Sequence, residues 1–145
     1  LPLKPVSKEE GIAWIKGSHL WDKLFIRTRF QEGHPVDGEA GEVNGKTYDI
    51  TPDILNNKDD YEFLQWDLEL GDCIFFDMRT LHGNLNQVTP KNDIHRYTLR
   101  MSKEGSRIYY RGDWAQEERA IMEANGYQNG DDLDGKMFPT LYTRL

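Results

Sequence analysis

The chain has 145 residues, of which 37% are hydrophobic and 12% aromatic, so it can build one modest hydrophobic core and is too apolar for a disordered protein. Its net charge of −7 argues against the cationic face that nucleic-acid binding needs. No apolar run approaches the roughly 20 residues that span a bilayer. Because Cys73 is the only cysteine, no internal disulfide can form. These features predict a single domain, residues 1–145, in a reducing, cytoplasmic setting.

The first part of the chain predicts short strands followed by a long loop. Residues 7–10 have the spacing of a capping box and predict one turn. Short strands are predicted over residues 12–16 and 24–30. Residues 31–60 are rich in glycine, acids and asparagine, which predicts a loop with one short helix beginning at Thr51-Pro52. A loop of this length is often a lid over an active site, and the alternative is a solvated insertion.

The second part predicts more strands and one helix near its end. Alternating or continuous apolar residues predict strands over 61–68, 73–76, 96–102 and 107–110, with a turn at 69–72. Residues 113–126 have a helical pattern, and an acidic, turn-rich tail follows. Many short strands with polar turns and one helix favour a mainly β fold, an antiparallel barrel or sandwich.

His82 is the histidine whose position is most suggestive of chemistry. It follows the predicted buried strand 73–76 and a turn that contains Asp77, Arg79 and Thr80. An imidazole at the end of a buried strand can bind a metal ion. A single histidine is more often structural, so the residues alone leave both interpretations open.

Arg96 and Arg100 lie at an even separation on a predicted strand and share one face with Thr98. Two arginines that face a barrel interior need anionic partners, and a guanidinium binds a carboxylate through two hydrogen bonds. If the same face is exposed to solvent, the arginines pair with surface acids instead. Spacing alone leaves both possibilities open.

Several segments, in order along the chain, resemble the phytanoyl-CoA dioxygenase family of iron(II)- and 2-oxoglutarate-dependent oxygenases. The segments are Gly11 through Gly17-Ser18-His19-Leu20-Trp21, Trp66-Asp67-Leu68-Glu69-Leu70-Gly71-Asp72, Phe76 through Leu81-His82-Gly83-Asn84 with Asn86, Arg96-Tyr97-Thr98-Leu99-Arg100, and Asn129 through Phe138-Pro139. Each segment alone is weakly specific for the family, whereas the ordered set of segments is much more specific.

The resemblance implies a double-stranded β-helix, a jelly-roll or cupin-like barrel, of which this chain would supply the later strands, a C-terminal helix and a tail. It implies an iron(II) site of two histidines and one carboxylate, with 2-oxoglutarate as co-substrate and hydroxylation of an aliphatic carbon in a small organic substrate. By this resemblance His82 is the distal iron ligand. Arg96 binds the far carboxylate of 2-oxoglutarate, with Arg100 as the alternative, and Ser18 contacts the co-substrate or substrate.

The sequence departs from the family pattern at one point. No His-x-Asp or His-x-Glu occurs in the 145 residues, although the family draws two iron ligands from that motif, upstream of the part that Gly11 matches. We therefore expect the chain to be a later portion of an oxygenase and to be inactive alone. The rival hypothesis is a non-catalytic β-barrel that binds an acidic small molecule without metal.

Overall fold

The computed structural model describes residues 1–26, 41–43, 46–85, 93–103, 106, 108–110 and 118–142. The chain forms two compact units, residues 1–98 and 99–145. The strands are β1 (Ala13–Ile15), β2 (Gly41–Val43), β3 (Lys46–Tyr48), β4 (Phe63–Leu64) and β5 (His82–Gly83), and the α-helix is α1 (Arg119–Ala124). Among the described residues, no helix has the length and apolar composition needed to cross a membrane.

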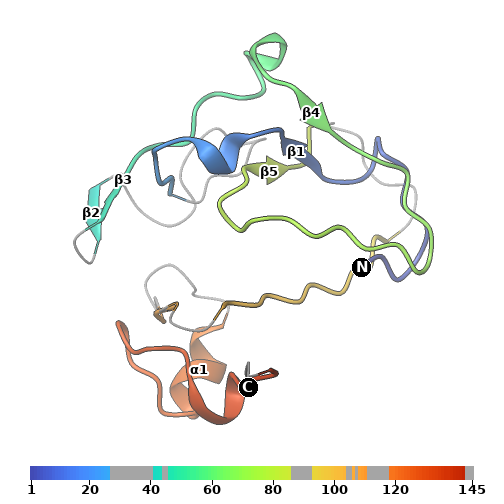
Figure 1. Ribbon diagram of the computed structural model, residues 1–145. Helices are drawn as coiled ribbons and strands as arrows, with labels where there is room; N and C mark the ends of the chain where they lie inside the picture. The colour runs from blue at the N-terminus through green and yellow to red at the C-terminus, as the bar shows by residue number, and fades with distance from the viewer. Residues whose placement is uncertain are drawn as a thin grey trace. The chain divides into compact units, whose positions relative to one another are not determined.

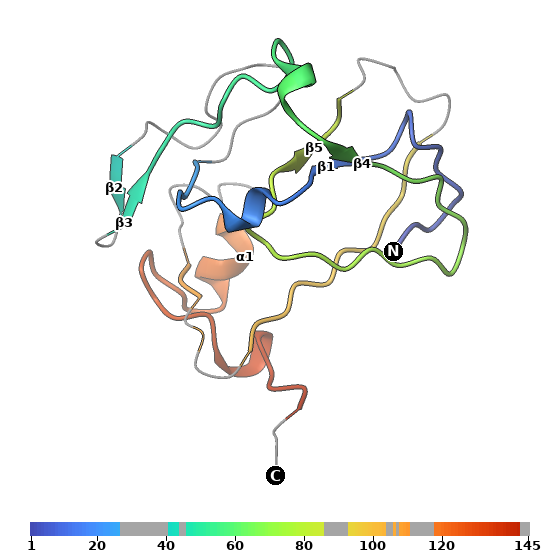
Figure 2. The same cartoon turned by 45° about the horizontal axis from the view of Figure 1, so that its top comes forward.

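Strand β1 lies at the centre of a three-stranded antiparallel sheet with the order β4-β1-β5 (Figures 1 and 2). Trp14 is paired with Leu64 of β4 on one side and with His82 of β5 on the other. Aromatic and β-branched side chains favour a strand at this point, and Gly17, at φ 76°, turns the chain into a 3-10 helix at Ser18–Leu20. The predicted strand at 12–16 is confirmed, and it places His82 beside Trp14.

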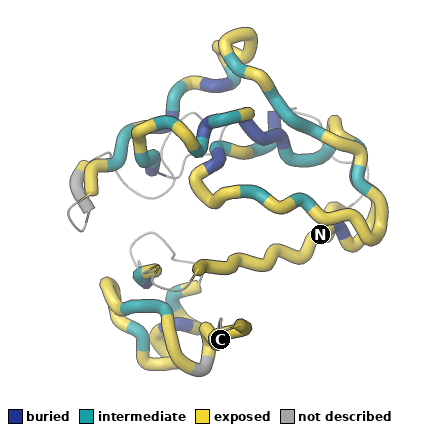
Figure 3. The backbone as a smooth tube through the Cα atoms, viewed as in Figure 1, coloured by how far each residue is buried: buried dark blue, intermediate teal, exposed yellow. Residues whose placement is uncertain are grey.

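The two faces of β1 have different surroundings because successive side chains of a strand point to opposite sides. Ala13 and Ile15 are buried in a core cluster with Ile54 and Leu85. In Figure 3 the tube is dark blue along β1. Partly buried side chains surround this cluster: Trp21, Leu55, Tyr61, Phe63 and Leu81. Trp14 projects from the other face, so the core lies on one side of the sheet and His82 on the other.

The N-terminal segment is tied to two later parts of the first unit by backbone hydrogen bonds. Val6 and Leu68 exchange two bonds of 2.9 Å and form an isolated antiparallel bridge. Pro2 and Arg96 form a second bridge. The predicted strand 61–68 is therefore seen only at β4 and at Leu68.

Residues 41–43 and 46–60 contain more secondary structure than a simple loop. Strands β2 and β3 pair as an antiparallel hairpin, with Glu42 opposite Thr47, and this hairpin was not predicted from the sequence. The hydroxyl of Thr51 donates to the carbonyl of Ile26 at 3.1 Å, and the short helix, of 3-10 type, begins later than predicted, at Lys58. Residues 31–40 lie outside the described residues, and the lid role of 31–60 stays a prediction.

Two predicted strands are wrong. Residues 73–76 form no strand, and the side chain of Phe75 is 85% exposed. Residues 96–102 pair with the N-terminal segment only through the bridge at Arg96 and the backbone hydrogen bonds of Tyr97 with Leu1, and they are exposed throughout. A strand needs a partner for its backbone groups, and neither segment has a continuous one among the described residues. The apolar pattern alone could not reveal this.

The second unit contains the predicted helix in shortened form. Helix α1 ends at Ala124, with Asn125 as its C-cap and Gly126 at φ 86°, as the sequence predicted. Its predicted beginning lies outside the described residues. Met122 is buried, whereas Ile121 is exposed. Of the predicted strand 107–110, residues 108–110 are described, and they show an isolated bridge from Tyr109 to Asp132. The described chain is mainly β with little helix, which confirms the coarse fold class.

Replacing Ile15 with alanine should destabilise the first unit. Ile15 is 1% exposed in the core cluster, so truncation leaves a cavity and should cost about 2–5 kcal/mol. Ile50→Ala is the matched control, because Ile50 is 55% exposed and its replacement should cost little. Denaturant unfolding followed by tryptophan fluorescence measures both changes. Equal effects of the two substitutions would contradict the assigned core.

Candidate functional site

Three aromatic side chains gather around His82 on the face of the sheet opposite the core. The ring of Trp14 is stacked on that of His82 at 18°, with centroids 6.5 Å apart, and Phe76 presents an edge contact at 4.9 Å. The ring centroids of Trp66 and Trp14 are 5.9 Å apart, and Trp66 remains 47% exposed. The indole N–H of Trp14 is buried without an acceptor among the described residues. The cluster therefore places apolar surface and one donor without an acceptor beside the imidazole, which remains exposed.

The imidazole of His82 is oriented by its own turn. Nδ1 lies 2.7 Å from the carbonyl oxygen of Thr80. A carbonyl oxygen only accepts hydrogen bonds, so Nδ1 must carry the proton in this contact. In the neutral imidazole the lone pair is then on Nε2. Histidines that bind metals commonly donate their other ring N–H to a carbonyl in this way, so the chemistry of His82 fits a metal ligand that binds through Nε2.

Ser18 is buried and connects the loop after β1 to the residue before His82. Its hydroxyl donates to the carbonyl of Ile15 at 2.8 Å and accepts from the backbone N–H of Leu81 at 2.9 Å. The structure thus brings Ser18 and His82 together through Leu81. The expected contact between Ser18 and a co-substrate stays a prediction.

The turn before His82 contains an ion pair between Asp77 and Arg79, which are two residues apart. The N–H groups of Arg79 donate to the carboxylate of Asp77, from the backbone at 2.8 Å and from Nε at 3.2 Å. The side-chain hydrogen bonds from Arg79 lower the pKa of Asp77 below its usual value, and the backbone hydrogen bond and the charges of Arg79 and His19 add to this, against a smaller desolvation effect. Asp77 thus stays ionised at neutral pH and pairs with Arg79.

Arg96 and Arg100 do not share a buried face. Both are exposed, Arg96 on the segment that bridges to Pro2 in the first unit and Arg100 in the second unit. The expected inward-facing strand is absent because residues 97–102, all described, form no ladder. An exposed guanidinium can still bind the carboxylate of a small molecule, so their roles stay predictions.

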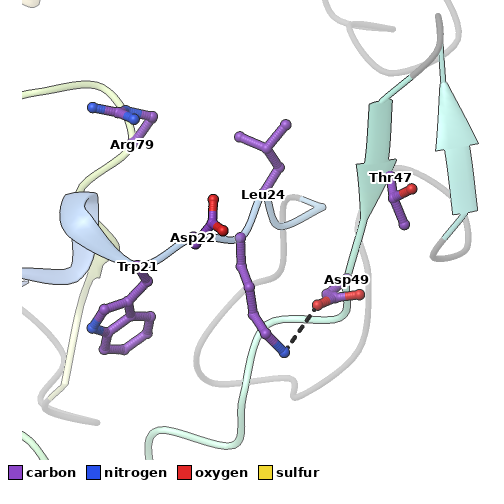
Figure 4. A pocket seen from close by; sticks show the side chains of 7 residues that line it. Trp21, Asp22, Leu24, Thr47, Asp49 and Arg79 are labelled. Carbon is purple, nitrogen blue, oxygen red and sulfur yellow. Dashed lines mark ion pairs between the residues drawn. The ribbon is translucent and has the colours of Figure 1, made fainter.

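A shallow, open depression of about 320 Å³ lies elsewhere in the first unit, and its labelled side chains are shown in Figure 4. It is lined by Trp21, Asp22, Lys23, Leu24, Thr47, Asp49 and Arg79. Lys23 pairs with Asp49 at 3.1 Å, the dashed line of Figure 4, and Arg79 pairs with Asp77. Since these charges already have partners, the depression carries no argument for a catalytic centre.

A complete metal site is not assembled by the described residues. No group of three or more histidine, cysteine, aspartate or glutamate side chains among them could hold a metal ion. His82 could supply one ligand through Nε2. A complete site would need further ligands from residues outside the described part of the chain. Sequence reasoning proposed His82 and Ser18 as site residues, which stays a prediction, and missed the contacts of Thr80 and Phe76, which depend on the turn geometry.

The protein is mainly β, with an open antiparallel sheet, and His82, which lies beside aromatic rings on that sheet, is a candidate transition-metal ligand. The chain belongs to the phytanoyl-CoA dioxygenase family, whose family model matches residues 1–93. The matched segment contains Ser18 and His82, and Arg96 and Arg100 follow it. No curated protein and no solved structure matches the chain.

Replacing Arg79 with alanine should raise the pKa of Asp77 toward the usual value of about 3.9. Because the folded-state pKa is lowered, the ion pair stabilises the fold above the unfolded-state pKa, and this stabilisation disappears as the pH falls through the folded-state pKa. The pH dependence of the Asp77 carboxyl carbon shift measures both pKa values. Lys23→Ala should leave the titration unchanged, and identical midpoints in the wild type and Arg79→Ala would contradict the pairing.

Proposed function

We propose that the chain is part of an iron(II)- and 2-oxoglutarate-dependent dioxygenase that hydroxylates an aliphatic carbon of a small organic substrate. The observation that supports this most strongly is His82. It lies within the segment that matches the family, and its Nδ1 is engaged by Thr80, so that Nε2 can bind a metal. In the complete enzyme we propose a double-stranded β-helix, to which the β4-β1-β5 sheet contributes later strands.

In this proposal the chain's own residues bind and orient. His82 supplies one iron ligand. Arg96 binds the far carboxylate of 2-oxoglutarate through two charge-assisted hydrogen bonds, with Arg100 as the alternative. Bound iron(II) supplies the activation of dioxygen, which is consumed together with 2-oxoglutarate and a substrate C–H bond to give succinate, carbon dioxide and the C–OH product.

The aromatic cluster at His82 has two roles in the same proposal. Trp14 and Phe76 present apolar surface to His82, and Trp66 extends this surface from Trp14, which would limit the access of water to the reacting groups in the complete enzyme. The same rings can contact the carbon skeleton of the substrate. The exposed, free thiol of Cys73 fits a reducing, cytoplasmic location for this chemistry.

The rival proposal is a non-catalytic β-barrel that binds an acidic small molecule without metal. Neither His-x-Asp nor His-x-Glu occurs in the 145 residues, and the described residues assemble no group of three metal-binding side chains, which both proposals accommodate. The two proposals make different predictions for the sequence of the full natural polypeptide. The oxygenase needs a His-x-Asp or His-x-Glu motif upstream, and the binding protein does not.

Iron(II) should bind the 145-residue chain weakly, because one imidazole cannot hold the ion without further converging ligands. An anaerobic titration compares this chain with the full natural polypeptide. For the latter we expect stoichiometric binding, weakened by His82→Ala by more than the roughly 10–100-fold that removal of a ligand's hydrogen-bond partner costs. His95→Ala is the matched control, because His95 is an exposed histidine with no proposed metal role.

Two results would contradict the iron assignment. Tight binding by the 145-residue chain that depends on His82 would reveal ligands within these residues that we have not identified. Unchanged binding by the His82→Ala full-length polypeptide would show that His82 is not a ligand.

Replacing Arg96 with alanine should raise the KM for 2-oxoglutarate in the full natural polypeptide. Removing a charge-assisted pair of hydrogen bonds costs about 1.5–3 kcal/mol, which corresponds to a rise of roughly 10–100-fold. Steady-state turnover with varied 2-oxoglutarate measures the change, and Lys103→Ala is the control, because Lys103 is an exposed cation with no proposed role. If Arg96→Ala leaves the KM unchanged while Arg100→Ala raises it, the carboxylate contact belongs to Arg100.

A further inference from the structure

Leu81, the residue directly before His82, is held through both of its backbone polar groups. Its N–H donates to the hydroxyl of Ser18 at 2.9 Å, and its carbonyl accepts from the N–H of Ile15 at 2.9 Å. The hydroxyl of Ser18 in turn donates to the carbonyl of Ile15 at 2.8 Å. The three residues form a closed set of hydrogen bonds between the end of β1 and the start of β5.

Two of the three residues in this set are buried, and Leu81 is partly buried. Ser18 is 3% exposed, and Ile15 is more deeply buried still. A buried N–H or carbonyl without a partner carries the full cost of desolvation. Strand β5 has only two residues, so its own pairing with β1 is short. The side chain of Ser18 therefore supplies a large share of the contacts that fix the start of β5.

The position of Leu81 also affects the imidazole of His82, because the two are adjacent in the chain. Thr80, whose carbonyl accepts from Nδ1 of His82, precedes Leu81, and His82 follows it. If Leu81 shifts, the acceptor and the imidazole both shift. The hydroxyl proton of Ser18 is already given to Ile15, so a carboxylate, which only accepts, could bind Ser18 only by breaking that bond.

We propose that Ser18 is a positioning residue, which fixes the ring orientation of His82 through Leu81 and does not contact 2-oxoglutarate. The part of this proposal that concerns iron rests on the proposed dioxygenase function. The part that concerns the orientation of His82 does not, because it follows from hydrogen bonds within the chain.

The orientation of His82 is tested on the 145-residue chain without metal. In Ser18→Ala, hydrogen exchange of the Leu81 amide should be about tenfold faster, and the ring nitrogen shifts of His82 should show a smaller share of the Nδ1-protonated form. Ser18→Thr keeps a hydroxyl and should restore both signals. Ser7→Ala is the matched control, because the hydroxyl of Ser7 bonds only locally, to Glu10 at 3.1 Å.

The amide of Leu68, which donates to the carbonyl of Val6, reports whether a variant keeps the fold of the first unit, to which Ser18 also belongs. If Ser18→Ala leaves both the Leu81 exchange and the His82 ring signals unchanged, the positioning role is overturned. The same holds if these signals change equally in Ser7→Ala. These outcomes do not depend on iron, so they decide the orientation even if the dioxygenase proposal fails.

The consequence for iron is tested in the full natural polypeptide by anaerobic iron(II) titration and by 2-oxoglutarate dependence at saturating iron. Ser18→Ala should weaken iron binding roughly 10–100-fold, the range expected when the support of a ligand is removed, and should leave the KM for 2-oxoglutarate unchanged. A raised KM with unchanged iron affinity would overturn the proposal in favour of direct contact. If the wild type binds no iron, the dioxygenase function fails, and the ring signals of His82 alone decide the role of Ser18.

Discussion

The pairing of β1 with strands on both sides is the constraint on which the site depends. Because side chains alternate along a strand, one register places Ala13 and Ile15 in the core and Trp14 on the opposite face. The pairing of Trp14 with His82 then follows from that register. A shift of one residue would bury Trp14 in the core and separate it from the imidazole. The core and the candidate ligand are thus set by the same few hydrogen bonds.

A short strand that carries a proposed ligand needs support beyond its own ladder. In β5 this support comes from three directions: the hydroxyl of Ser18 through Leu81, the carbonyl of Thr80 on Nδ1, and the rings of Trp14 and Phe76. Each contact restricts the imidazole differently. Together they leave Nε2 as the nitrogen for a metal ion, while the ring stays at an exposed surface.

The sequence predicted features that depend on neighbouring residues more successfully than features that depend on distant partners. The strand at 12–16, the turn at 7–10 and the stop of the helix at Asn125-Gly126 follow from local side-chain chemistry, and the structure contains all three. The segments 73–76 and 96–102 have strand-like patterns, but no continuous ladder forms along them. The β2–β3 hairpin was missed because glycine and acidic residues there outweighed a weak strand pattern.

The site shows the same division. His82 and Ser18 were found from motifs, because their residue types and positions match a family pattern. The contacts of Ser18 with Ile15 and Leu81 span up to 63 residues, and no local pattern encodes them. The position of Arg96 was predicted from strand parity, which failed when the strand was absent. Sequence thus identified candidate residues, and only the fold could say what holds each one.

The central claim is that His82 binds iron through Nε2 while Nδ1 donates to Thr80. It is tested most directly by anomalous diffraction at the iron edge, with anaerobic crystals of the full natural polypeptide grown with iron(II) and 2-oxoglutarate. The account predicts an iron peak within coordination distance of His82 Nε2, with the hydrogen bond from Nδ1 to the Thr80 carbonyl retained. An iron peak remote from His82, or an iron ion bound to Nδ1 in place of the Thr80 carbonyl, would contradict it.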